Sequence, residues 1–194
     1  MHAKPEDSLS ESKPKRSPLE DRLLKTRTIL LFGEITQKVA REVSEKLIVL
    51  SAESDDPIRI FINSQGGHVE AGDTIYDMIR FVKPPVKIIG TGWVASAGAL
   101  IYCAPPVENR FSLANTRFML HQPSGGVGGQ ATDISIEAQE ILKMRERLNR
   151  IFSRQTGQPI EKIEKDTDRN YWMTAEEGKK YGLVGKVVNS ITEI

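Results

Sequence analysis

The sequence contains little cysteine and no long apolar run. Cys103 is the single cysteine among 194 residues, so an internal disulfide framework is excluded, as is usual in a reducing compartment. No apolar stretch approaches the length that crosses a bilayer, and the N-terminus lacks the apolar core of a signal peptide. These absences predict a soluble protein of the cytoplasm.

The chain also lacks an excess of charge of either sign. It has 27 lysines and arginines against 26 aspartates and glutamates. No basic stripe interleaved with aromatic residues is present, which argues against nucleic acid as a partner. There is no nucleotide-binding P-loop, and the three histidines and one cysteine show no metal-ligand spacing. We therefore expect no metal, no cofactor and no direct use of ATP.

The composition divides the chain into two regions. Residues 1–18 are polar and rich in proline and serine, which is typical of a flexible leader or tail. Residues 19–194 carry the apolar patterning of one domain that is long enough to bury a core.

Strand-like and helix-like segments alternate along that domain. Strands are predicted over 28–32, 58–63, 86–91, 111–114, 117–121 and 184–188. Helices are predicted over 18–26, from Thr36 to about Leu50, around Ile75, over 97–104, over 134–155, and from Thr174, which has capping-box spacing with Glu177. Residues 64–68 and 125–129 are expected to be loops because of their glycines. The alternation predicts an α/β domain.

One serine lies at a junction that favours reactivity. Ser96 stands between the predicted strand 86–91 and a short helix of small residues. At the first turn of a helix, unpaired N–H groups and the positive end of the dipole stabilise a developing negative charge. His121 ends a second apolar strand further along. A serine and a histidine at strand ends predict a nucleophile with its general base.

Several motifs in a fixed order give the chain a resemblance to a known family. They are the Ser96 junction, the turn Ser64-Gln65-Gly66-Gly67, the run His121-Gln122-Pro123, and the segments 129–134, 140–143 and 164–169. Together they resemble ClpP, the peptidase subunit of the Clp ATP-dependent proteases, over residues 19–194. The resemblance implies a crotonase-like fold of repeated β-β-α units with a protruding handle helix, the handle region covering residues from about 122 to 156.

The resemblance also implies an activity and an assembly. Members of the family form heptameric rings, and two rings stack into a tetradecamer around a closed proteolytic chamber. An AAA+ unfoldase ATPase of the Clp type docks on a ring and feeds unfolded polypeptides into it. The chain is thus expected to be a serine endopeptidase subunit that contacts neither nucleic acid nor membrane.

Residue roles follow from matching positions in the family. Ser96 would be the nucleophile, His121 the base, and the backbone N–H groups of Gly67 and Ala97 the oxyanion hole. A substrate lying as an added strand would contact His68, Val69, Ser124, Gly125 and Gly126. The apolar positions expected to dock the unfoldase are Phe61, Phe81, Ile89, Phe111, Leu113 and Val188. Asp168 and Arg169 are expected to make contacts between rings.

The third triad position departs from the family pattern, because Asn170 stands where an aspartate is usual. Its amide oxygen can orient the histidine, but it cannot stabilise the imidazolium by charge. In another serine protease, the same replacement of aspartate lowers turnover by about 10⁴-fold. We therefore expect a Ser96–His121–Asn170 triad with low or conditional activity.

Two other functions stay open at this point. The first is a weakly active or regulatory ring subunit in a mixed assembly with an active ClpP paralogue. The second is an acyl-CoA hydratase or isomerase of the same fold superfamily. The second is disfavoured because such enzymes stabilise an enolate without a nucleophilic serine and are usually longer.

Overall fold

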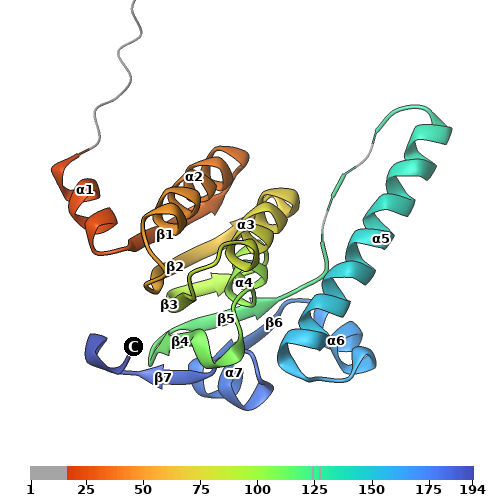
Figure 1. Ribbon diagram of the computed structural model, residues 1–194. Helices are drawn as coiled ribbons and strands as arrows, with labels where there is room; N and C mark the ends of the chain where they lie inside the picture. Colours follow the sequence, from red (N-terminus) through yellow and green to blue (C-terminus); the bar gives the residue numbers. More distant parts are fainter. Residues whose placement is uncertain (1–16, 124, 127) are drawn as a thin grey trace, which may run out of the picture.

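The structure, a computed structural model, describes residues 17–123, 125, 126 and 128–194 (Figure 1). Apart from Ser17 and Pro18, the predicted leader lies outside the described residues. The main elements are α1 (Pro18–Lys25), β1 (Thr28–Ile35), α2 (Gln37–Glu53), β2 (Ile58–Gly67), α3 (Val69–Phe81), β3 (Val86–Ala95), α4 (Ala97–Tyr102), β4 (Arg110–Leu113), β5 (Arg117–Leu120), α5 (Ala131–Thr156), α6 (Ile160–Thr167), β6 (Tyr171–Thr174), α7 (Ala175–Tyr181) and β7 (Lys186–Val188). Short 3-10 helices cover Val107–Asn109 and Ile191–Glu193.

The strands form one mixed sheet, so the predicted α/β class is confirmed. Within the described residues, five strands pair in parallel in the order β1-β2-β3-β4-β7. β5 also pairs with β3 in parallel, and β6 pairs with β5 in the antiparallel direction. β5 therefore lies between β3, the strand that leads to Ser96, and β6, which begins directly after Asn170.

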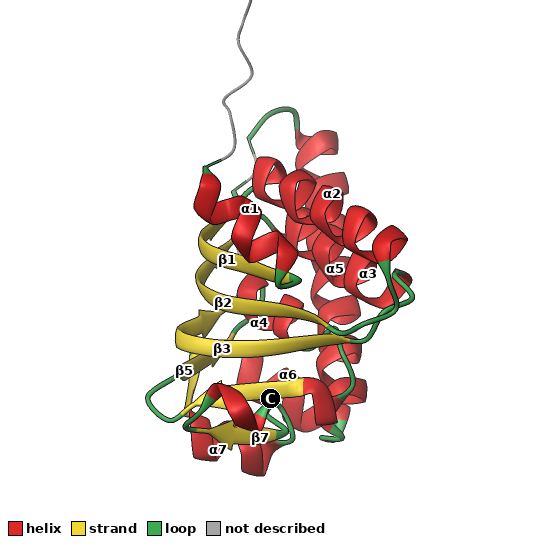
Figure 2. Cartoon of the chain, turned by 60° about the vertical axis from the view of Figure 1, so that its left-hand side comes forward, coloured by secondary structure: helices red, strands yellow, loops and turns green. Residues whose placement is uncertain are grey.

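The core lies between the sheet and the helices that cover one of its faces. Ile58, Ile60 and Ile62 on β2 are fully buried, because every second side chain of a strand points to the same face. α2 and α3 lie along the same side of the strands (Figure 2) and add Leu47 and Ile75 to this apolar cluster. Burial of each such side chain stabilises the fold by about 2 kcal/mol.

The ends of α7 follow local rules that the sequence already indicates. The side chain of Thr174 accepts a hydrogen bond from the backbone N–H of Glu177, whose carboxylate accepts one from the backbone N–H of Thr174. This reciprocal pair confirms the predicted capping box. Gly182 ends the helix with φ +86°, and a Cβ there would overlap the carbonyl oxygen of Thr156. Both features require glycine at 182.

α5 projects from the rest of the molecule (Figure 1), as expected of the handle helix. It begins three residues earlier than the predicted start at Ile134. Its buried side chains, Leu148, Asn149 and Phe152, all lie in the C-terminal half, so most of the preceding helix is exposed in the single chain. Neither α5 nor any other described helix is both long and apolar enough to cross a membrane.

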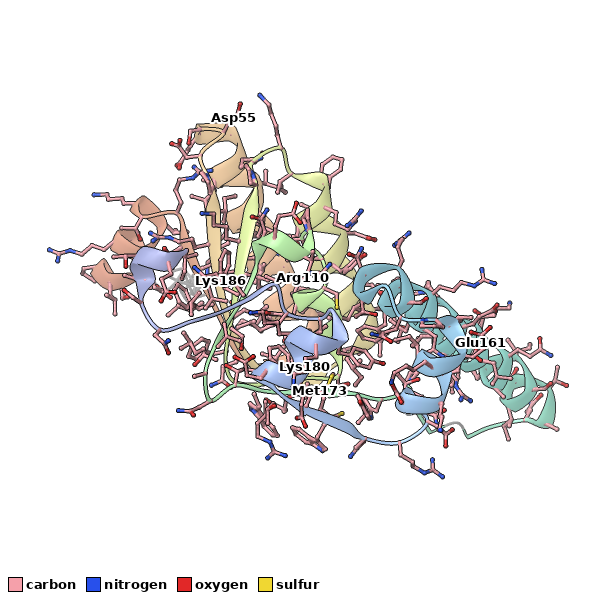
Figure 3. The ribbon with its side chains drawn as sticks, turned by 90° about the horizontal axis from the view of Figure 1, so that it is seen from below. Asp55, Arg110, Glu161, Met173, Lys180 and Lys186 are labelled. Carbon is pink, nitrogen blue, oxygen red and sulfur yellow. The ribbon has the colours of Figure 1, made fainter. Side chains whose placement is uncertain are left out.

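A buried arginine holds the base of α5 to the sheet. The side chain of Arg110 on β4 is almost fully buried and donates hydrogen bonds to the carbonyls of Pro105 and Gln155 and to the side-chain oxygen of Gln155. Gln155 in turn donates to the Tyr76 hydroxyl on α3 at 3.0 Å. Figure 3 shows Arg110 near the centre of the molecule, with Asp55 at its periphery. This network satisfies the buried guanidinium and joins three elements.

Several predicted boundaries are wrong. β2 continues through 64–67, predicted as a loop, because Ser64 pairs with Val94 on β3 and the two glycines pair with β1 after a bulge. β3 likewise extends to Ala95, with Gly92 at φ +62°. α4 ends at Tyr102, and β7 begins at Lys186 rather than at 184. Pairing with a neighbouring strand decides where a strand ends, and this pairing is not encoded in the local pattern.

The sequence patterns also do not predict α6 or β6. β6 consists of four residues, Tyr171–Thr174, and its partner β5 is distant in the sequence. The run of aromatic and β-branched residues that it contains is a signal that favours a strand. β6 matters because it begins directly after Asn170 and so places this residue at the edge of the sheet.

Candidate active site

Ser96 lies at a sharp turn between β3 and α4. Its φ is +56° and its ψ is −122°; within the described chain only Arg27 is another non-glycine residue with positive φ. Such a conformation costs about 1–3 kcal/mol and persists where the surroundings fix it. Here the N–H of Ser96 donates to the carbonyl of Met119 at 2.9 Å, and its carbonyl accepts from the N–H of Ala99 at 2.9 Å. The turn resembles the strained strand-to-helix elbow that presents a nucleophile.

Gly66 leaves the space that the Ser96 side chain occupies. A Cβ at Gly66, where φ is +101°, would lie 2.6 Å from Cβ and 3.0 Å from Oγ of Ser96. The buried hydroxyl of Ser64 accepts a hydrogen bond from the N–H of Gly66 at 3.0 Å and so holds the end of β2 in place. The sequence pattern alone does not reveal this role of Ser64, although Ser64 belongs to the turn that carries the family resemblance.

His121 reaches Ser96 from the end of β5. Its Nε2 lies 2.7 Å from Oγ of Ser96, which is hydrogen-bond distance. The parallel pairing of β5 with β3 brings the two strand ends side by side. Burial lowers the pKa of the His121 imidazole below its ordinary value of 6.5. The ring is therefore neutral at pH 7 and able to accept a proton.

The backbone amides predicted to form the oxyanion hole flank this pair. Ala97 is the first residue of α4, where N–H groups have no intrahelical acceptor. Gly67 ends β2 directly after Gly66, which lies against Ser96. Gly67 has φ +152°, and a Cβ there would overlap the backbone of Ile35 on β1. Only glycine fits this position.

Asn170 and His121 lie just beyond the end of the β5–β6 ladder, and no hydrogen bond joins them among the described residues. The β5–β6 ladder ends at the pair Leu120–Tyr171, so His121 and Asn170 are the next residues on either strand. Asn170 is exposed, and within the described residues no hydrogen bond joins it to His121. Burial is the one cause of the lowered His121 pKa, with no contribution from a carboxylate. The structure thus brings Asn170 near the pair without the orienting contact.

A separate set of contacts holds the segment before β6 against the end of β5. The N–H of Gln122 donates to the carbonyl of Thr167 at 2.6 Å, and its Nε2 donates to the carbonyl of Asp168 at 2.8 Å. The carboxylate of Asp168 lies 3.4 Å from the guanidinium of Arg145 on α5. Arg169 is exposed. Within one chain, Asp168 therefore acts as a link between β5 and α5.

The predicted substrate-binding residues lie on two segments. His68 precedes α3 and is exposed, and Val69 is the first residue of α3. Gly125 and Gly126 are exposed in the connection between β5 and α5, which runs alongside α5 (Figure 1). Ser124 lies outside the described residues. The role of these residues stays a prediction.

Most of the apolar residues predicted to dock an unfoldase gather in one small cluster. The cluster consists of buried Ile89, Phe111 and Val188, with Phe61 and Ile194 packed against them. Leu113 is partly exposed and pairs with Val188 between β4 and β7. Phe81 does not join this cluster; it is the last residue of α3 and is 82% exposed.

The geometry supports covalent catalysis through a serine. A hydroxyl held 2.7 Å from a neutral imidazole nitrogen can lose its proton to that nitrogen while it attacks an acyl carbon. Within the described ranges, no group of three or more His, Cys, Asp or Glu side chains is arranged to hold a metal ion.

Comparison with known sequences finds close relatives over the whole domain. Residues 12–191 match the model of the Clp protease family. The ATP-dependent Clp protease proteolytic subunit 3 of Rhizobium meliloti (strain 1021) is 61% identical over 192 residues, covering 97% of this chain and 98% of the relative. The ATP-dependent Clp protease proteolytic subunit 2 of Gluconobacter oxydans (strain 621H) is 58% identical, covering 98% of this chain and 87% of the relative.

Solved structures share the fold. ClpP1 from Listeria monocytogenes is 55% identical, has a TM-score of 0.82, and matches 90% of this chain and 98% of its own. A mutant of the same protein, in which one asparagine is replaced by aspartate, has a TM-score of 0.84 at 56% identity. These likenesses confirm the predicted ClpP architecture.

Proposed function

The chain belongs to the Clp protease family and is a proteolytic subunit of its serine-peptidase type, and we propose that Ser96, His121 and Asn170 form its catalytic triad. The observation that carries this proposal is the 2.7 Å contact between Nε2 of His121 and Oγ of Ser96. A strained backbone at Ser96 and a neutral, half-buried imidazole support it, because both features are typical of an activated nucleophile.

In the proposed reaction, Oγ of Ser96 attacks the carbonyl carbon of a peptide while its proton passes to Nε2 of His121. The carbonyl oxygen becomes an oxyanion and accepts hydrogen bonds from the N–H groups of Gly67 and Ala97. The C–N bond then breaks, and His121 gives the proton to the departing amine. Water next attacks the acyl-enzyme with His121 again as base, which releases the acid and restores Ser96.

The proposed substrate is an extended, unfolded polypeptide bound through its backbone. His68 and Val69 would flank it on one side and the segment 124–126 on the other. Exposure of Gly125 and Gly126 supports this role, because residues without side chains allow close approach of another backbone. Such recognition is tolerant of sequence, which suits a peptidase for many unfolded proteins.

The proposed assembly is a tetradecamer of two stacked heptameric rings, with Asp168 and Arg169 at the contact between rings. Exposed apolar side chains on the projecting α5 support association with other copies, since such surfaces usually mark interfaces. They are Ile134, Ile136 and Leu142.

The proposed partners are an AAA+ unfoldase ATPase of the Clp type and, in a mixed assembly, a second ClpP paralogue. Partly exposed Leu113 and partly buried Phe61 would supply apolar surface for the unfoldase, and buried Ile89, Phe111 and Val188 would support them from below. Phe81 would contribute from the separate position at the end of α3. The proposal places this work in the cytoplasm, in agreement with the single cysteine.

Asn170 makes the proposed peptidase weakly or conditionally active. The missing hydrogen bond to His121 within the described residues supports this view, because an unoriented imidazole spends less time in the productive geometry. The alternative function is a regulatory ring subunit that works beside an active paralogue. Such a subunit would have the same fold as the proposed peptidase, but its Ser96 would not react.

Labelling with a fluorophosphonate probe tests the proposal. Oγ of Ser96 would attack the phosphorus and displace fluoride, so a ring-sized fraction from size-exclusion chromatography should become labelled. Ser96→Ala should abolish the label, and Ser44→Ala, which removes a hydroxyl that binds the carbonyl of Ala40 on α2, should retain it. A well-formed ring that stays unlabelled, alone and after mixing with a candidate paralogue, would favour the regulatory subunit.

A further inference from the structure

Three exposed side chains form a stack across the strands that lead to the proposed triad. Trp93 lies on β3, Arg117 on β5 and Trp172 on β6. In the strand registers, Trp93 pairs with Arg117, and Trp172 pairs with Met119, two residues beyond Arg117. Because side chains two residues apart on a strand share a face, all three lie on one face of the sheet.

The contacts within the stack are specific. The rings of Trp93 and Trp172 are nearly parallel, at 9°, with centroids 6.4 Å apart. The guanidinium carbon of Arg117 lies 4.3 Å from the centroid of Trp172. Both geometries are in the attractive range for stacked aromatic rings and for a cation over a ring.

The stack joins two strands that share no ladder. β3 and β6 both pair with β5, so their backbones are about 10 Å apart. Only large side chains can meet across an intervening strand, and indole rings have the required reach. The stack is thus a direct side-chain link between the strand of Ser96 and the strand that follows Asn170.

The stack lies on the face of the sheet toward which His121 and Asn170 are expected to point. His121 follows Arg117 by four residues, and Asn170 precedes Trp172 by two, so continuing the strand alternation places them on this face. The opposite face carries core residues of the same three strands. They are Val94, Phe118 and Met173, the last of which is labelled in Figure 3.

β6, the strand that follows Asn170, has one partner strand among the described residues. β6 has four residues, and within the described part of the chain it pairs with β5 alone. Asn170 lies beyond the last ladder pair and makes no hydrogen bond to His121 among the described residues. Side-chain contacts to β6 therefore add to the β5–β6 ladder and to the Gln122 hydrogen bonds in setting the distance of Asn170 from the Ser96–His121 pair.

We propose that Trp93, Arg117 and Trp172 are positioning residues that hold Asn170 beside His121; this inference rests on the triad of the proposed function. Trp93 is 44% exposed and Trp172 is 36% exposed, so the two residues are less buried than core aromatics are. Their main contribution is then the relative placement of three strands rather than the stability of the core. The stack acts on the reaction through Asn170.

A double-mutant cycle tests this coupling. The rate constant for fluorophosphonate labelling of Ser96 would be measured for the full chain, Trp172→Leu, Asn170→Ala and the double variant. Trp172→Leu should lower the rate about tenfold, since small misplacements of catalytic groups have effects of this order. In the Asn170→Ala background the same change should alter the rate less than twofold. Trp172→Phe, which keeps a ring over β5, should restore part of the rate.

Two controls separate positioning from general damage. Ile191→Ala truncates an apolar side chain that is 61% exposed and distant in sequence from the triad, and it should leave the rate unchanged. Trp93→Leu breaks the same stack from β3 and replaces Trp172→Leu if that variant does not fold. Ring assembly is checked for each variant by size-exclusion chromatography.

Four results would overturn the proposal. An equal loss in both backgrounds would show that the stack acts without Asn170. A raised KM for a peptide substrate with unchanged kcat would show that the rings contact the polypeptide instead. Ser96-dependent labelling that Trp172→Leu does not alter would remove the positioning role and leave the proposed function intact. Labelling that survives Ser96→Ala would remove both.

Discussion

The two ends of the proposed triad are held in very different ways. Ser96 sits between the buried residues Ala95 and Ala97, its backbone is hydrogen-bonded on both sides, and Gly66 leaves room for its side chain. Asn170 is exposed, follows the turn after α6, and lies just outside the β5–β6 ladder.

This contrast shows that one site can combine a part that is fixed in position, Ser96, with a part whose position can shift, Asn170. Close packing around Ser96 leaves no room for displacement, because protein interiors are packed like crystals. The segment of Asn170 is set by an edge strand and by side-chain contacts, which shift at lower cost. Changes near Ser96 should therefore abolish the reaction, whereas changes near Asn170 should raise or lower its rate.

The largest effect is expected where the packing around Ser96 is broken. Gly66→Ala would place a Cβ 2.6 Å from Cβ of Ser96 and displace the nucleophile, so labelling of Ser96 should fall by about 10³-fold. Gly157→Ala is the matched control: φ there is +74° but no heavy atom lies within 4 Å of the added Cβ. It should lower the stability by about 1 kcal/mol, measured by thermal unfolding, without altering labelling. Normal labelling of Gly66→Ala would show that close packing does not hold Ser96 in place more firmly than Asn170.

The next largest effect is expected from a substitution of Asn170, the member of the proposed triad whose position can shift. Asn170→Asp adds a carboxylate that can accept the Nδ1–H of His121 and stabilise its imidazolium, so kcat for a short peptide should rise about 10²-fold. Asn115→Asp, which adds the same charge in the exposed turn before β5, serves as the control and should have no effect. If both variants or neither accelerate turnover, Asn170 is not the third member of the triad.

A smaller effect is expected from the loss of the Gln122 hydrogen bond that joins the end of β5 to the segment before β6. Gln122→Ala removes the 2.8 Å bond from its amide to the carbonyl of Asp168, so the labelling rate should fall about fivefold as the segment before β6 loosens. Gln158→Ala removes a comparable 3.0 Å bond to the carbonyl of Tyr181, away from the site. Equal rates for the two variants would show that the Gln122 contact does not influence the reaction.

The smallest expected change is in the pH dependence. Labelling needs neutral His121, and burial lowers the pKa of this group, so the rate should fall only as the pH drops through a midpoint below 6.5. In Asn170→Asp the new carboxylate favours the imidazolium and raises that pKa, which moves the midpoint to higher pH. A pH series of labelling rates for both proteins measures the shift. A midpoint that moves down on adding the carboxylate would show that residue 170 does not face His121.

The sequence alone singles out a candidate nucleophile and a candidate base, but it does not predict the structural setting of Asn170. Ser96 and His121 follow apolar strands, and the motifs around them are local, so pattern and order are sufficient to single them out. Asn170 precedes β6, a four-residue strand that no periodicity reveals. The family resemblance groups Phe81 with the other apolar docking positions, yet Phe81 lies apart from their cluster because it ends a helix rather than lying on the sheet.

By itself the sequence determined the α/β class, the capping box at Thr174 and the long helix α5, because each depends on side chains near one another in the chain. It also singled out Ser96 and His121 as the candidate nucleophile and base. Only the tertiary structure decided that residues 64–67 belong to a strand and that Trp93 and Trp172, which are 79 residues apart, stack across β5. Pairing between distant segments sets such contacts, and its energy comes from partners that no local window contains.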